Sequence, residues 1–175
     1  YTEEVPIAQL LRDSKVYSIY EGTTGIQAMD LLGRKLTMNN GAASMAMMEE
    51  VTKTLEEAKT IESIKPLAEK AENLQSKIAE TLMGLFSVAQ TGDTNLFMCN
   101  ATPFLEAFSQ MLMSWQWVSQ AIVAQQALDA GTDETDFYEA KLKTAQYYIN
   151  WVTPQALATL STIQTNERTA LDFKE

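Results

Sequence analysis

The stretch Lys65–Gly92, KPLAEKAENLQSKIAETLMGLFSVAQTG, decides the fold class, because its apolar residues recur every three or four positions. That spacing lines one face of an α-helix. The apolar stripe consists of Leu67, Ala71, Leu74, Ile78, Leu82 and Leu85. Pro66 suits a first helical turn, where its missing N–H costs nothing, and Gly92 suits a helix end. The stretch predicts a long amphipathic helix that must bury its stripe against other elements.

The segments around this helix repeat the pattern and predict an all-α protein. Upstream, a helix carries Met45, Met48, Val51, Leu55 and Ala58 at the same spacing. Downstream, Thr102-Pro103 forms a cap and first position for a helix that stops near Gly131 and carries Leu105, Phe108, Leu112, Trp115 and Ile122. Another helix, capped by Thr132 or Asp133, reaches Trp151 with Phe137, Lys141, Thr144 or Ala145, and Tyr148 on one face. Thr153-Pro154 begins a last helix, followed by a polar tail. Residues 42–165 therefore predict an antiparallel bundle of four or five helices.

Two further helices are predicted before the bundle. Residues 6–16 form the first, with Pro6 in its opening turn, and residues 24–35 form the second. The second carries Ile26, Met29 and either Leu32 or Leu36 on its apolar face. Asn39-Asn40-Gly41 is the strongest helix breaker in the chain. We therefore predict a boundary that separates residues 1–40, as the end of a larger helical domain, from residues 41–175.

Composition excludes several classes of function. The net charge of −10 would repel nucleic acid and anionic membrane surfaces, and no apolar run approaches the roughly 18 residues that span a bilayer. The chain has no histidine, which rules out Ser-His-Asp catalysis and histidine-ligated metal sites within it, so we expect no metal. Cys99 cannot form an intramolecular disulfide, which suits the cytoplasm. Its place near a helix start could lower the pKa of the thiol, although an ordinary packing role is the simpler interpretation.

The segment Tyr20-Glu21-Gly22-Thr23-Thr24-Gly25 is the main candidate for chemistry. It places one carboxylate directly before a turn that opens a helix, where free backbone N–H groups can hold phosphate or an oxyanion. A glutamate there can act as a base. Taken alone, such a glutamate is most often a solvated or helix-capping carboxylate, and Thr23 and Thr24 can be capping hydroxyls.

Residues 1–38, including the helix that precedes this segment, resemble the end of the catalytic domain of the acyl-CoA dehydrogenases, a flavoenzyme family. The resemblance implies FAD as cofactor, an acyl-CoA substrate and Glu21 as the base that takes the α-proton. It implies that the backbone N–H of Glu21 polarises the thioester carbonyl, that Tyr20 and Glu21 contact substrate, and that Gly22, Thr23, Thr24 and Gly25 lie against the flavin. Gly25 departs from relatives that have a polar side chain there. The family also implies homo-oligomers and an electron-transfer flavoprotein as partner.

The bundle resembles a C-terminal extension found in a longer, mostly bacterial branch of this family, which includes dehydrogenases acting on methylthiopropionyl-CoA. No flavin-binding domain is recognisable in the chain, so we expect a C-terminal fragment that is inactive alone. Two alternatives stay open, a non-catalytic interaction or oligomerisation module and an acyl-CoA oxidase. Arg12-Asp13 is either a clamp for ligand or a structural pair. The methionines and Trp115, Trp117 and Trp151 are interpreted as core or interface residues.

Overall fold

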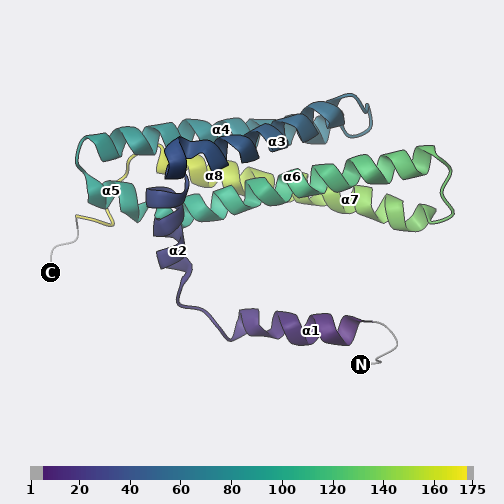
Figure 1. The fold of residues 1–175 in the computed structure, drawn as a ribbon, viewed down its shortest axis with the longest axis horizontal. Helices are drawn as coiled ribbons and strands as arrows, with labels where there is room; N and C mark the ends of the chain where they lie inside the picture. Colours follow the sequence, from purple (N-terminus) through teal and green to yellow (C-terminus); the bar gives the residue numbers. More distant parts are fainter. Residues whose placement is uncertain (1–5, 173–175) are drawn as a thin grey trace.

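The computed structural model describes residues 6–172, and within that range all regular structure is helical (Figure 1). This confirms the all-α prediction. The α-helices are α1 (Ile7–Lys15), α2 (Thr24–Asp30), α3 (Ala42–Lys59), α4 (Lys65–Gln90), α5 (Thr94–Cys99), α6 (Ala101–Asp129), α7 (Thr135–Trp151) and α8 (Thr153–Ile163).

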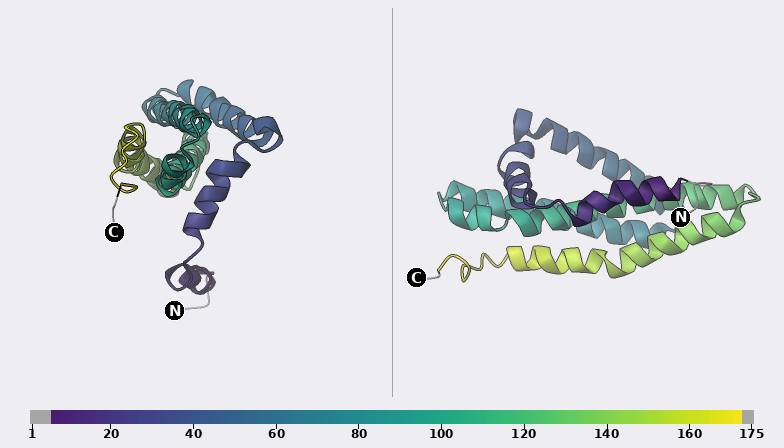
Figure 2. Two further views of the ribbon diagram at one scale, coloured as in Figure 1. Left: turned by 90° about the vertical axis from the view of Figure 1, so that its left-hand side faces the viewer. Right: turned by 90° about the horizontal axis from the view of Figure 1, so that it is seen from below.

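The bundle has four rods, because α7 and α8 follow one another along a single side of it (Figures 1 and 2). The other three rods are α3, α4 and α6, and short loops make successive rods antiparallel. The helical rod is interrupted between α7 and α8 at Val152, because Pro154 lacks the N–H that would continue the helical hydrogen bonds. The predicted Thr153-Pro154 helix start is therefore present. It bends the rod, and α8 continues along the same side of the bundle as α7.

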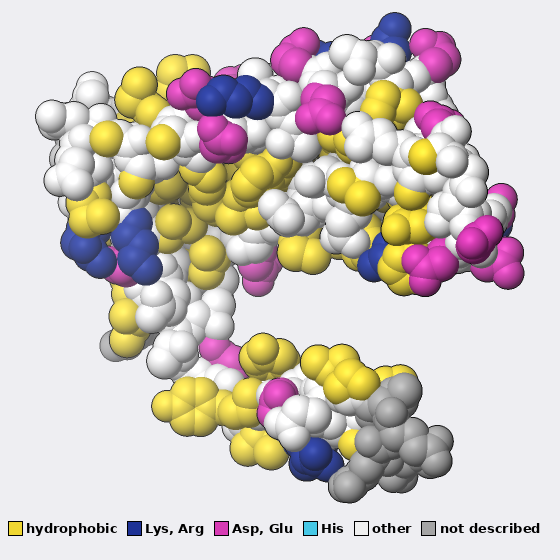
Figure 3. All heavy atoms as spheres, turned by 45° about the vertical axis from the view of Figure 1, so that its right-hand side comes forward, with side chains coloured by type: hydrophobic (Ala, Val, Ile, Leu, Met, Phe, Trp, Pro, Cys, Tyr) yellow, Lys and Arg dark blue, Asp and Glu magenta, His cyan; other side chains and the backbone are white. Residues whose placement is uncertain are grey.

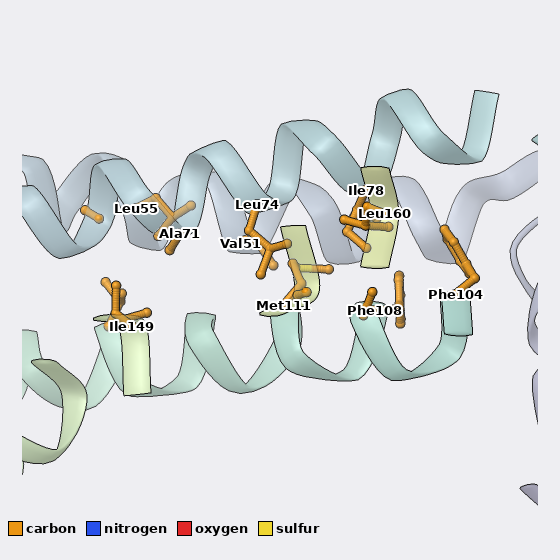
Figure 4. Close-up of a cluster of buried hydrophobic side chains, with 14 of the residues drawn as sticks. Val51, Leu55, Ala71, Leu74, Ile78, Phe104, Phe108, Met111, Ile149 and Leu160 are labelled. Carbon is orange, nitrogen blue, oxygen red and sulfur yellow. The ribbon is translucent and has the colours of Figure 1, made fainter. Parts of the chain in front are cut away.

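The core lies between the four rods, and large apolar side chains from all of them meet there (Figure 4). Five of the six predicted stripe residues of α4 are buried, and Leu82 is half-buried. Fully enclosed side chains from the other rods include Leu55, Phe104, Met111, Ile149 and Leu160. Burying one such side chain stabilises a fold by about 1.5–3 kcal/mol, so this shared interior is the main source of stability.

Helix α6 buries a different face from the predicted one. Of the five predicted residues only Phe108 and Ile122 are buried, whereas Leu105, Leu112 and Trp115 are partly exposed. The buried positions include Phe104, Ala107, Met111, Ser114, Val118 and Ala121. The helix packs against α3, α4, α7 and α8, so it is apolar around most of its circumference. The predicted face was assigned from the largest apolar side chains, and it therefore left out the buried alanines and Ser114.

A buried pair of hydroxyl side chains, Ser114 and Thr153, connects α6 to α8 inside the core. The Ser114 hydroxyl donates to the backbone carbonyl of Gln110 at 2.8 Å, and it lies 3.1 Å from the hydroxyl of Thr153. Since Ser114 has one hydrogen to donate, Thr153 is the donor in the second bond. Both side chains are buried, so this pair satisfies two hydroxyls that would otherwise be costly to bury.

Three helix starts differ from prediction. Helix α5 was not predicted; Asp93 caps it by accepting from the backbone N–H of Leu96 at 3.0 Å. Helix α6 begins at Ala101, so Pro103 stands third in it and Thr102 is no cap. Helix α7 begins at Thr135, after the predicted caps. Of these three helices, only α5 has a side-chain cap; α6 and α7 begin without one, so a capping residue type near a helix start does not by itself fix where the helix begins.

Helix α2 packs on the bundle through a face that was only partly predicted. Ala28, Leu32 and Leu36 are buried in the bundle core, whereas Ile26 and Met29 are exposed. A π-helical turn over Leu31–Lys35, in which the N–H of Leu36 donates to the carbonyl of Leu31 at 3.1 Å, follows the helix. Leu32 and Leu36 are four residues apart across this turn, a spacing that keeps both side chains on one helical face, and both face inward.

The predicted breaker is present at residues 39–41. Asn39, Asn40 and Gly41 have φ angles of 53°, 57° and 77°, a left-handed run that no α-helix continues through. The predicted boundary between residues 40 and 41 stays a prediction, and α2 shares the bundle core although it precedes this break. Among the described residues, no helix is both long and apolar enough to cross a membrane.

Candidate functional site

The candidate segment lies in the connection between the 3₁₀ turn Val16–Ser18 and α2, below the bundle (Figure 1). Gly22 has a φ angle of 141°, which only glycine adopts without strain. Thr23 then precedes the first residue of α2, and Gly25 lies in its first turn. The local sequence therefore forms the glycine turn and helix start that its residues predict.

Glu21 is held against the start of α2. One carboxylate oxygen accepts from the backbone N–H of Thr24 at 3.1 Å and also from the Thr24 hydroxyl. The Thr24 hydroxyl, followed by backbone hydrogen bonding at Gly22 and Thr24, holds the pKa of Glu21 below its ordinary value. In this arrangement Glu21 caps the helix, and its carboxylate is a weaker base than an ordinary glutamate.

The site is open to solvent. All residues from Tyr20 to Gly25 are exposed, and Tyr20 keeps 76% of its surface accessible. No side chain lies within 4 Å of the position where a Cβ on Gly22 or Gly25 would stand. The segment thus presents one wall of a site, with Glu21, two glycines and two threonines on it, and no opposite wall within the described residues.

The exposed apolar side chains beside this segment extend the same open surface. Helix α1 stands away from the bundle (Figures 1 and 2), and its Ile7, Leu10 and Leu11 are exposed and line a shallow groove with Tyr17. Arg12 and Asp13 do not pair with one another. Each bonds to Gln9, at 3.0 Å and 2.7 Å, which supports a structural role within α1.

The structure also shows the surroundings of Cys99 and of two of the tryptophans. Partial burial, and secondarily the charge of Asp93, raise the pKa of the Cys99 thiol, which is opposite to the lowering considered for a thiol at a helix start. Trp115 donates to the Thr54 hydroxyl at 2.9 Å and is part of the core packing. Trp151 is 66% exposed, so it is a surface residue rather than a core residue.

Comparison with known proteins identifies the family. Residues 47–174 match the family model described as "Acetyl-CoA dehydrogenase C-terminal like". The whole chain is 30% identical to the broad-specificity linear acyl-CoA dehydrogenase FadE5 of Mycobacterium tuberculosis, over 30% of that protein's length. It is 32% identical to the 3-methylmercaptopropionyl-CoA dehydrogenase of Ruegeria pomeroyi, over 93% of the chain and 28% of that protein.

A butyryl-CoA dehydrogenase of Syntrophomonas wolfei is also 30% identical over the whole chain, which covers 29% of that relative. The chain therefore spans less than a third of the length of these relatives. The family model covers most of the bundle, and the relatives extend the match to the residues before α2, which include Glu21. On this basis the chain belongs to the acyl-CoA dehydrogenase family, as a match to its C-terminal part.

Proposed function

We propose that the chain is the C-terminal part of an FAD-dependent acyl-CoA dehydrogenase, in which Glu21 abstracts the α-proton of an acyl-CoA thioester. The observation that carries the proposal is the position of Glu21, one residue before a glycine turn at a helix start, in a chain that aligns with dehydrogenases along its full length. The remaining walls of the site, and with them activity, would be supplied by residues outside this chain.

The roles of the segment follow from the chemistry of oxidation at Cα and Cβ. The Glu21 carboxylate takes the α-hydrogen as a proton, and the electron pair of that C–H bond forms the new Cα=Cβ double bond while the β-hydrogen leaves with its electron pair. The backbone N–H of Glu21 would donate to the thioester carbonyl, because stabilising charge on that oxygen makes the α-proton acidic. Tyr20 would lie beside the acyl-CoA.

The segment would hold one face of FAD, and that cofactor would supply the acceptor for the β-hydrogen as hydride. Gly22 and Gly25 have open space above their Cα atoms, so a flat ring can approach the backbone closely. Thr23 and Thr24 add hydroxyl groups at the same edge. Gly25 can offer only its backbone, so any polar contact at that position comes from main-chain atoms.

The pKa of Glu21 is lowered in this open arrangement, so an active site that uses Glu21 as a base would have to raise it. Its carboxylate is stabilised by Thr24 and by water, both of which weaken it as a base. Covering the segment with a substrate and a second wall would remove water and raise the pKa of Glu21, since desolvation disfavours the charged carboxylate. Rotation of the side chain away from Thr24 would release it toward the thioester.

The same proposal includes the finer expectations drawn from the resemblance. Electrons would leave through an electron-transfer flavoprotein, the intact protein would be a cytoplasmic homo-oligomer, and the acyl chain stays unspecified. An acyl-CoA oxidase would share the first half-reaction and differ by forming hydrogen peroxide. A second function, assembly of subunits by the bundle, is favoured by one observation: the bundle closes its own core and holds no buried carboxylate.

The test is Glu21→Gln in the full-length protein that contains this chain. The amide keeps the backbone N–H and the size of the side chain but cannot accept the proton. We expect flavin absorbance and acyl-CoA binding to persist while kcat falls about 10²–10⁴-fold, the contribution of a general base. Asp13→Asn is the matched control on α1 and should keep full activity. Near-normal turnover by the Glu21→Gln enzyme would refute the assignment of the base, and peroxide formation would identify an oxidase.

A further inference from the structure

A small apolar groove lies between α6 and α7 at the end of the bundle farthest from α5. Val123 and Ala124 line it from α6, and Phe137, Tyr138 and Lys141 line it from α7. Ala124 is buried, whereas Val123 and Phe137 are 57% and 53% exposed. Its volume is about 170 Å³, below the roughly 300–1,000 Å³ typical of small-molecule sites. The groove has room for one large side chain rather than for a cofactor.

Lys141 is fixed along one edge of the groove. Its ammonium group donates to the Gln120 side-chain oxygen at 3.2 Å and lies 5.4 Å from the ring centre of Phe137 and 5.8 Å from that of Trp117. Cation–π contacts at these distances hold the charge against the aromatic faces. The groove therefore has an ordered edge before anything enters it, and Trp117 lies close enough to report on an occupant.

The α6–α7 loop and the helix ends on either side of it are strongly acidic at the open end of the groove. Residues 129–140 contain five carboxylates and no lysine or arginine. Of these, only Glu139 forms a salt bridge, with Lys143, among the described residues. Asp133, Glu134 and Asp136 precede or adjoin Phe137 at the start of α7, and acidic side chains and exposed apolar ones lie side by side at this end of the bundle in Figure 3.

Helix stability does not account for all of this charge. Acidic side chains at the start of α7 favour its dipole, but Asp129 is the last residue of α6, where a negative charge opposes the helix dipole. Its carboxylate accepts only from the Gln125 amide, at 2.9 Å. A chain that already carries a net charge of −10 thus concentrates uncompensated carboxylates beside exposed apolar side chains.

We propose that this groove docks a basic amphipathic helix of a partner protein. One large apolar side chain of that helix enters between Val123 and Phe137, and lysine or arginine residues on its flanks face the carboxylates of residues 129–136. Charge complementarity selects this occupant. An anionic membrane surface would be repelled, and a second copy approaching by this same end would oppose its own acidic loop.

The test uses the full-length protein that contains this chain and a synthetic 18-residue helical peptide of leucine and lysine, with a leucine and glutamate peptide of identical apolar face as control. Binding is followed by tryptophan fluorescence at low and high salt. We expect the lysine peptide alone to bind. The triple variant Asp133→Asn, Glu134→Gln, Asp136→Asn should lower the affinity about tenfold, in line with exposed ion pairs of a few tenths to one kcal/mol each.

Matched controls separate docking from general attraction between opposite charges. The triple variant Glu69→Gln, Glu80→Gln, Glu106→Gln removes the same charge from exposed positions elsewhere on the bundle and should bind as the wild type does. Val123→Asp should abolish binding, and the milder Val123→Ser, with unchanged circular dichroism, should weaken it. The proposal is overturned if the control triple loses equal affinity or if both Val123 variants bind normally. It is also overturned if sedimentation shows a dimer that Val123→Asp dissociates, because the occupant would then be a second copy.

Discussion

The bundle, residues 42–163, and the arm, residues 6–23, are built from the same kind of amphipathic helix but reach opposite outcomes. In the bundle, apolar faces of four rods cover one another, and residues such as Leu74 and Phe104 are fully buried. In the arm, Ile7, Leu10 and Tyr17 are largely exposed. Amphipathicity therefore specifies that a face can be covered, and the presence of a complementary surface decides whether it is covered.

The two regions also differ in what they contribute: the bundle supplies most of the buried core, and the arm carries the residues of the proposed site. The bundle has a closed core and a satisfied internal hydrogen bond between Ser114 and Thr153. The arm holds Glu21 and the glycine turn, with little buried area to order them. Under the proposed function, residues outside this chain would cover Glu21 and would set both its position and its pKa.

The largest expected effect comes from shortening a leucine in each region. Leu74→Ala in the core should lower the free energy of unfolding by about 2–5 kcal/mol, since it removes buried methyl groups and leaves a cavity. Leu10→Ala on α1, where the leucine is 64% exposed, should change it by less than about 0.5 kcal/mol. Urea denaturation followed by circular dichroism measures both. A comparable loss in both variants would mean that the arm packs on the bundle.

A smaller effect is expected from the polar pair inside the bundle. Ser114→Ala should cost about 1–3 kcal/mol, because it leaves the buried Thr153 hydroxyl without its acceptor. Adding Thr153→Val should cost less than the sum of the two single changes. Ser161→Ala is the matched control: that hydroxyl makes the same kind of bond, to the Leu157 carbonyl, on the exposed surface. An equal cost at Ser161 would show that burial is not the cause.

The junction between the regions should respond more weakly. Gly41→Ala places a Cβ at a φ angle of 77° with only an ordinary 3.5 Å contact to the Leu36 carbonyl, so the left-handed backbone alone should cost about 1–2 kcal/mol. Gly84→Ala, within α4 and facing open space, should instead stabilise the bundle by about 0.5–1 kcal/mol. Thermal unfolding of both variants tests the opposite signs. Two changes of the same sign would contradict this assignment.

The smallest expected effect is a pH dependence at Asp93. The Leu96 N–H, and secondly the Arg168 side chain, hold the pKa of Asp93 below its ordinary value of 3.8. A depressed pKa contributes stability above the unfolded value, and this contribution is lost as pH falls below about 3.8. The difference in stability between wild type and Asp93→Ala should therefore be largest near neutral pH and shrink in acid.

Glu21 provides the matched comparison in the arm. Its pKa is lowered as well, but the segment that it caps lies outside the core. Glu21→Ala should therefore leave the unfolding of the bundle unchanged at every pH, as measured by urea denaturation at neutral and acid pH. A pH-dependent loss equal to that of Asp93→Ala would show that the arm and the bundle unfold as one unit.

Prediction from sequence succeeded where one local rule dominates. The α4 stripe, the break at residues 39–41 and the Thr153-Pro154 start follow from periodicity, left-handed backbone preference and proline geometry. It failed where neighbours choose among similar options. The predicted buried face of α6 was wrong because that helix meets partners on several sides. Ile26 and Met29 are exposed because α2 packs on the bundle through the face of the smaller Ala28, which a search for large apolar residues overlooks. Residues 129–140 carry five carboxylates and no lysine or arginine, which can be counted in the sequence, whereas the apolar groove beside Phe137 appears only in the fold.

The sequence by itself determined that this protein is helical, that its helices must pair, and that its one candidate base is a carboxylate at a helix start. These properties depend on residues close together in the chain. Only the tertiary structure decided that α7 and α8 form one broken rod, that Ser114 and Thr153 meet, and that the segment around Glu21 lies in open solvent. The reason is physical: burial depends on which distant surfaces exclude water, and no local pattern encodes that.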